Sequence, residues 1–132
     1  MSNTVETTFA IPASPDKAIL ANIKLKITRK DACNNRVQLI STVGDEGITG
    51  ISQVLFRILR DNIKIFNAQV GIESTDLEQF YAQTFQAIDQ DVSSGTHVYS
   101  LTVESLTSGT IADVIGPLSF SGLAIGQVHK CC

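Results

Sequence analysis

The 132-residue sequence contains no tryptophan, only two tyrosines and few charged side chains. Charged residues make up 17% of the chain, against roughly a quarter in an average soluble protein. No run of lysine or arginine could neutralise a phosphate backbone, and aromatic side chains that could stack on bases are scarce. The composition therefore argues against a nucleic-acid partner and indicates a weakly charged surface.

Long apolar runs are also missing. No stretch approaches the roughly 18 residues of a membrane span, and the N-terminus lacks the basic segment and apolar core of a secretory signal. We therefore expect no membrane partner and synthesis as a soluble intracellular product. The length fits a single domain.

Cysteine is sparse and unevenly placed. Cys33 lies in a polar stretch, and Cys131 and Cys132 are the last two residues. One interpretation is three reduced thiols, as expected in a cytoplasmic protein. The alternative is that these cysteines form disulfides between subunits once the surroundings become oxidising, because a thiol on a terminal tail reaches other chains easily.

Alternation of apolar and polar residues with period two is the main pattern, and it predicts an all-β protein. Residues 21–28 show it most clearly, and 97–104 repeat it. Two β-rich runs flank Asp61 and Asn62, which predicts a hairpin. Only 74–81 has helical character, of one turn at most.

About eight short strands at this spacing predict a single jelly-roll-like β-sandwich. We expect the sandwich to span residues 9–126, with an extended N-terminal arm at 1–8 and a cysteine-containing C-terminal tail at 127–132. Because an exposed strand edge pairs readily with another chain, the arm residues Val5, Thr7 and Phe9 are candidates for a contact between subunits.

No catalytic or metal site can be assembled from the sequence. His97 and His129 are far apart, so we expect no metal and no cofactor, and His97 is predicted to be solvated at the end of a strand. The carboxylates mostly suit turns or polar faces, and 89–95 is predicted to be a loop. Gly44, Gly47 and Gly50 are interpreted as a mobile turn. We expect no enzyme activity.

Several phrases of the sequence, taken in order, resemble exosporium protein C of Bacillus-type spores. The resemblance covers nearly the whole chain and is carried by the phrases at 9–15, 35–39, 54–61, 78–81, 94–103 and 116–124.

This resemblance implies a jelly roll similar to the trimeric heads of the tumour necrosis factor and complement C1q type. It also implies a structural subunit of the spore surface, in the exosporium or an appendage fibre, made in the mother cell without a signal peptide. Its partners would be copies of itself, as a homotrimer that could stack into a filament, and other spore-surface proteins. The cysteine pair at the C-terminus is not part of that resemblance. The alternative function is a carbohydrate- or receptor-binding module, because jelly rolls often carry ligand sites on their loops.

Overall fold

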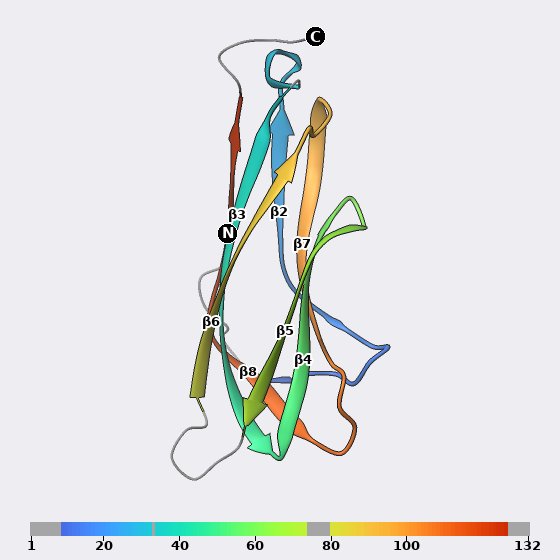
Figure 1. The fold of residues 1–132 in the computed structure, drawn as a ribbon, viewed down its shortest axis with the longest axis vertical. Coiled ribbons are helices and arrows are strands. Elements are labelled where there is room, and N and C mark those ends of the chain that lie inside the picture. Colours follow the sequence, from blue (N-terminus) through green and yellow to red (C-terminus); the bar gives the residue numbers. More distant parts are fainter. Residues whose placement is uncertain (1–8, 33, 74–79, 127–132) are drawn as a thin grey trace.

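The computed structural model describes residues 9–32, 34–73 and 80–126. These residues form two four-stranded sheets that lie against each other (Figure 1). A single 3₁₀ turn, η1 (Arg29–Asp31), is the helical element in these ranges, and they contain no helix long and apolar enough to cross a membrane. The strands are β1 (Phe9–Ala10), β2 (Ala18–Ile27), β3 (Arg36–Thr49), β4 (Ile51–Arg60), β5 (Ile63–Glu73), β6 (Phe80–Gln90), β7 (Gly95–Ser105) and β8 (Ile111–Ile125).

Both sheets are built from antiparallel neighbours. We name the sheet with strand order β1-β8-β3-β6 sheet A, and the sheet with order β2-β7-β4-β5 sheet B. Seven strands are long and β1 has two residues. The predicted all-β sandwich is therefore confirmed.

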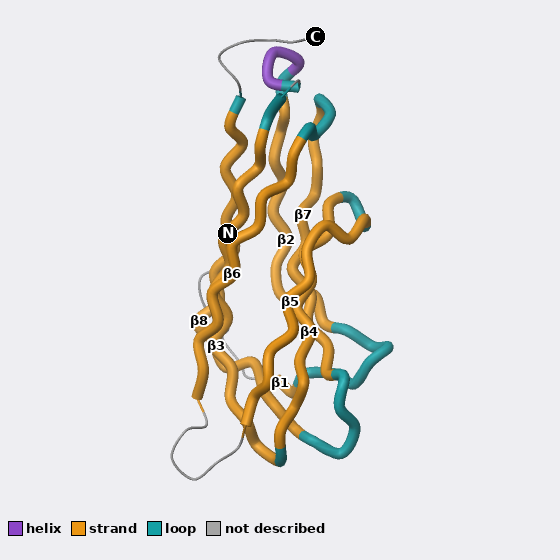
Figure 2. Tube along the Cα trace, viewed as in Figure 1, coloured by secondary structure: helices purple, strands orange, loops and turns teal. Residues whose placement is uncertain are grey.

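The strands pair from the outside of the chain inward. β1 pairs with β8, β2 with β7, β3 with β6 and β4 with β5. Successive pairs alternate between sheet A and sheet B, so the chain resembles one long hairpin rolled up on itself, with the β4–β5 turn at its tip (Figure 2). At this turn Asp61 and Asn62 both have positive φ, as a two-residue hairpin turn requires. The predicted hairpin is confirmed.

The core lies between the sheets, on the inward face of each strand. In β4 the buried residues are Val54, Phe56 and Ile58, at alternate positions. The rings of Phe56 and Phe85 join the two sheets with centroids 4.9 Å apart. The alternation predicted for residues 21–28 is also present, because β2 keeps its lysines exposed and Ile27 buried.

A bulge interrupts the pairing of β3 with β8. Val43 faces Leu118 and Asp45 faces Val114, so residues 115–117 bulge opposite Gly44. A side chain at Gly44 would collide with the Gly116 carbonyl, which explains the glycine.

Two of the predicted loops are wrong. Gly44 and Gly47 lie within β3, and only Gly50 lies in the following turn. The predicted loop at 89–95 is shorter, because β6 continues to Gln90 and β7 starts at Gly95. Of the predicted helical turn, 74–79 lie outside the described residues, while the next two residues already belong to β6.

Candidate functional site

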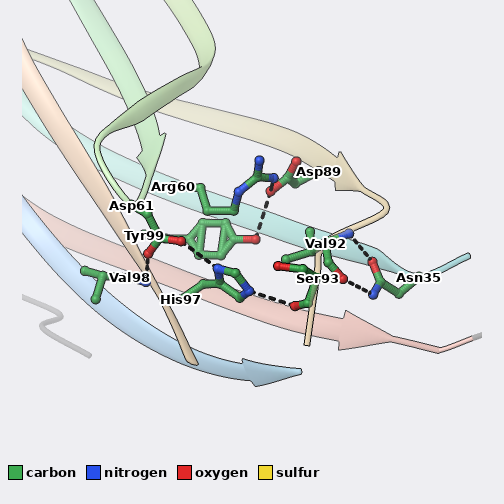
Figure 3. A network of polar contacts seen from close by, with 9 residues as sticks. All are labelled: Asn35, Arg60, Asp61, Asp89, Val92, Ser93, His97, Val98 and Tyr99. Carbon is green, nitrogen blue, oxygen red and sulfur yellow. Dashed lines mark hydrogen bonds and ion pairs between the residues drawn. The ribbon is translucent and has the colours of Figure 1, made fainter. Parts of the chain in front are cut away.

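A polar network occupies one end of the core between the two sheets (Figure 3). Asp89, near the end of β6, is almost fully buried. It accepts a hydrogen bond from Tyr99 Oη at 2.9 Å and forms an ion pair with Arg60 at 2.5 Å. Burial, and then the hydrogen bond to Asp89, raise the pKa of Tyr99. The cation on β4 therefore lies where it compensates a carboxylate on the other sheet.

His97 continues this network toward the β4–β5 turn. Its Nδ1 lies 2.6 Å from Asp61 Oδ2 and its Nε2 lies 2.7 Å from the Ser93 carbonyl oxygen. Both partners accept hydrogen bonds, so the doubly protonated imidazolium satisfies both ring nitrogens. The hydrogen bond to Asp61 raises the pKa of His97. The Val98 backbone N–H, followed by His97, lowers the pKa of Asp61.

The prediction of a solvated His97 is therefore wrong. The residue is 9% exposed, because its side chain faces inward along β7 in the same row as Tyr99. The histidine connects the β4–β5 turn to the β6–β7 loop. This geometry suits a structural role, in which His97 holds the two loops together.

Asn35 also holds the β6–β7 loop, through the backbone of Val92. Its Nδ2 donates to the Asp31 carbonyl at 2.6 Å and the Val92 carbonyl at 2.7 Å, and its Oδ1 accepts from the Val92 N–H at 2.8 Å. One buried amide thereby makes hydrogen bonds to three backbone groups. The whole network holds loops in place.

Asp45 is a buried carboxyl at the other end of sheet A. Its side chain shares the core-facing side of β3 with Val43 and is fully buried. With its amide turned so that nitrogen faces the carboxylate, Gln83 donates to both oxygens, at 3.1 Å to Oδ1. Desolvation raises the pKa of Asp45 to about 7, and the Gln83 hydrogen bond only partly opposes this. No cation is recorded against this carboxylate among the described ion pairs.

Glu104 is a third buried carboxylate, on the outer face of sheet B. Arg57 Nη1 lies 2.7 Å from its Oε1, and the Ser14 hydroxyl donates to its other oxygen. The segment between β1 and β2 thus covers this carboxylate. Asp45 and Asp89 face the core, and Glu104, although on an outer face, is buried. These three carboxylates are exceptions to the predicted placement of solvated carboxylates in turns or on polar faces.

The outer face of sheet A has a different character. Residues 38–44 of β3, 82–88 of β6 and 118–123 of β8 contain no charged side chain. Large apolar side chains are exposed on this face, with Ile88 55% and Leu123 60% exposed on either side of Gln38. The other charged residues of these strands either lie toward the strand ends or, like Asp45 and Asp89, are buried. An uncharged, partly apolar surface of this kind is typical of a contact with another protein.

A polar hollow lies at the end of the sandwich, beside the polar network. Its volume is about 310 Å³, and asparagine, glutamine and charged residues line it: Asn34, Asn35, Arg36, Gln90 and Asp91. It has no aromatic side chain of the kind expected in a carbohydrate site. Within the described ranges, no group of three or more histidine, cysteine, aspartate or glutamate side chains could hold a metal ion.

Comparisons with known proteins do not assign the chain to a family. No protein-family model and no curated protein matches the chain. Among solved structures, the chain is similar to the insecticidal δ-endotoxin Cry8Ea1 from Bacillus thuringiensis, at 12% identity and a TM-score of 0.45. The match covers 95% of this chain and 26% of the endotoxin, so the chain spans about a quarter of that protein's length. A likeness at this level bears on neither family nor function.

The residues predicted to link subunits fall mainly outside the described part. Cys33, Cys131, Cys132, Val5 and Thr7 all lie outside the described residues.

Phe9 is described as part of β1, where it faces Val114 of β8 in the same chain. The surface of sheet A is the feature that sequence reasoning missed. The absence of charge from three separate segments was its signal, but only the strand pairing shows that they are neighbours.

Proposed function

We propose that the chain is a self-assembling structural subunit, and that its role is not catalytic. The observation that carries the proposal is the uncharged surface of sheet A, where three neighbouring strands expose isoleucine, leucine, threonine and serine instead of charged side chains. Monomeric proteins rarely leave such a surface uncovered, and a further copy of the chain is a suitable cover for it.

The proposed setting is the bacterial spore surface, in the exosporium or an appendage fibre. It rests on the sequence resemblance to exosporium protein C, as do synthesis in the mother cell, association with other spore-surface proteins and assembly as a homotrimer. The inward sequence of strand pairs, from β1 with β8 to β4 with β5, supports the jelly roll that this family implies. A jelly roll likewise has eight strands in two sheets.

Disulfides between copies are a further part of the proposal. Cys131 and Cys132 would reinforce contacts that the sandwich makes without them, with Cys33 as a third candidate. Val5, Thr7 and Phe9 remain the proposed arm between subunits, although the backbone of Phe9 already pairs within its own sheet.

Sedimentation velocity and negative-stain electron microscopy test this function. The full chain and a Cys131→Ser, Cys132→Ser variant should be measured with and without reductant. We expect both proteins to form assemblies larger than a monomer, and the wild-type assemblies alone to resist dilution under oxidising conditions. Monomers at every concentration and in every redox condition would show the proposed function to be wrong.

The carbohydrate- or receptor-binding alternative gains no specific support from the structure. The polar hollow beside Asn35 lacks the aromatic lining that such a site would use. Reproducible binding on a glycan array would nevertheless bring that alternative forward.

A further inference from the structure

β8 forms the edge of sheet A for much of its length. β3 pairs with it along one side, whereas β1 pairs on the other side only with Asp113 and Val114. Beyond the bulge at 115–117, residues 118–125 therefore have no partner strand on their second side within the described part of the chain. A strand edge with unpaired N–H and C=O groups is a template for pairing with another chain.

Beyond the bulge at 115–117, this open edge lacks the charged side chains that discourage such pairing. Residues 114–126 contain no charged side chain, and Leu123 and Ile125 are exposed on its outer side. The edge strands of sheet B differ, since β2 exposes Lys26 and β5 exposes Lys64. Lysine on an edge strand opposes contact between edges. The two sheets are thus protected to different degrees.

There is also space beside the edge. An open groove of about 350 Å³ runs between β2 and β8, lined by both strands. At Gly122 a side chain would lie within 3.0 Å of Ile23 and Leu25, so a glycine here lets β2 close the sandwich beneath β8 without filling the groove. Among the described residues, no strand occupies the second side of 118–125.

We infer that the open edge of β8 pairs, antiparallel, with the same edge of a second copy about a twofold axis. This inference rests on the proposed function and names one of its contacts. In a twofold contact every residue faces residues of its own segment, so a charged segment would meet its own charge. The absence of charge from 114–126 makes this segment compatible with itself.

The contact would extend sheet A across two copies, in the order β6-β3-β8-β8-β3-β6. The exposed Ile40, Ile88 and Leu123 of both copies would then share one surface. A twofold contact of this kind, added to a threefold one, joins separate trimers and enlarges the assembly.

Ser121 offers a test that leaves the core intact. It is exposed on the outer side of β8 and faces Ile40 of β3, whose other neighbour is Gln86 of β6. Ser121→Lys and Ser121→Glu each place like charges together across the proposed axis, while an equal mixture places opposite charges there. Gln86→Lys and Gln86→Glu are matched controls, since they put the same charges in the same row of the same face but at the other edge of the sheet. Each can weaken a contact made by the face, but position 86 does not meet its own copy across the proposed axis, so an equal mixture should not restore association.

Self-association should be measured by sedimentation velocity in reductant, with thermal unfolding to check that each variant is folded. We expect each Ser121 variant alone to associate about fivefold more weakly than wild type, the scale for like charges facing across strands. The mixture of Ser121 variants should recover wild-type association, whereas the mixture of Gln86 variants should associate no better than either Gln86 variant alone.

Three outcomes would overturn the inference and leave the proposed function standing: Ser121 variants that associate like wild type, a Ser121 mixture that does not recover, or a Gln86 mixture that recovers to the same extent. The third would place the contact on the face of sheet A. A wild-type protein that never associates would overturn the proposed function as well.

Discussion

Replacing Asp45 with asparagine tests how the buried carboxyl couples folding to pH. Asp45 is fully buried beside Gln83, and desolvation raises its pKa from 3.8 to about 7. Below about pH 4 the carboxyl holds its proton in both the folded and the unfolded chain. As the pH rises from about 4 to 7, the unfolded chain loses this proton while the folded chain retains it. Stability therefore falls across this window and levels off above it.

The size of this loss follows from the two pKa values. Each unit of difference corresponds to about 1.4 kcal/mol, so a change from 3.8 to about 7 sets an upper limit of about 4 kcal/mol at alkaline pH. Between pH 5 and pH 8 the same values give a change of about 2–3 kcal/mol. Asparagine is neutral throughout and can still bond with the Gln83 amide, so the Asp45→Asn variant should escape this loss.

Urea unfolding of the wild type and the Asp45→Asn variant at pH 5 and pH 8, in reductant, measures the effect. We expect the variant to gain about 2 kcal/mol relative to wild type on going from pH 5 to pH 8. Comparing differences removes the contributions of other titrating groups and any fixed effect of the substitution. Gln83→Glu is a useful companion, because it replaces the amide donor with a second carboxyl and should increase the loss at pH 8. An Asp45→Asn difference that is the same at both pH values would show that the carboxyl is ionised at neutral pH, and the argument from burial would be wrong.

Three further predictions concern the polar contacts. His97→Gln should remove a contribution to stability that is present below about pH 6.5 and lost as the pH rises through the raised pKa of the imidazole; thermal unfolding at pH 5.5 and 8.5, with NMR titration of the ring, would detect it, and a ring that titrates at or below its ordinary pKa would contradict it. Arg57→Ala should lower the free energy of unfolding by about 2 kcal/mol, because it leaves the buried carboxylate of Glu104 without its cation. Ser14→Ala should lower it by only about 1 kcal/mol. Equal losses of unfolding free energy in urea would count against the ion pair. Tyr99→Phe should cost about 1–2 kcal/mol, since it removes one of the two partners of a buried carboxylate, and an unchanged urea midpoint would argue that this hydroxyl is dispensable.

The parts of the fold that depend on local pattern were predictable. Alternation in β2 and β7 marks strands because side chains of a strand point alternately to its two faces. Asp61 and Asn62 tolerate positive φ better than most residues, so a tight turn between two β-rich runs was readable from the sequence.

The polar residues of the core could not be placed in this way. Asp89 and His97 sit near strand ends, where sequence pattern favours solvent, and only the packing of one sheet on the other buries them against Arg60 and Asp61. The sequence predicts a turn at Gly44, because a glycine between β-type residues indicates either a turn or a close approach of backbone. The bulge of β8 that demands it lies more than 70 positions later in the sequence.

The rolled hairpin also determines when this protein can fold. Its innermost pair, β4 with β5, joins neighbouring segments, but its outermost pair joins Phe9 to Val114. Most strand partners are distant in sequence, and such topologies fold slowly because long loops must close before their contacts form. During synthesis β3 cannot pair with β8 until β8 has been made, so sheet A cannot be completed until β8 has left the ribosome. The surface proposed for assembly is thus the last to form, which delays contact between copies until each chain has its full sandwich.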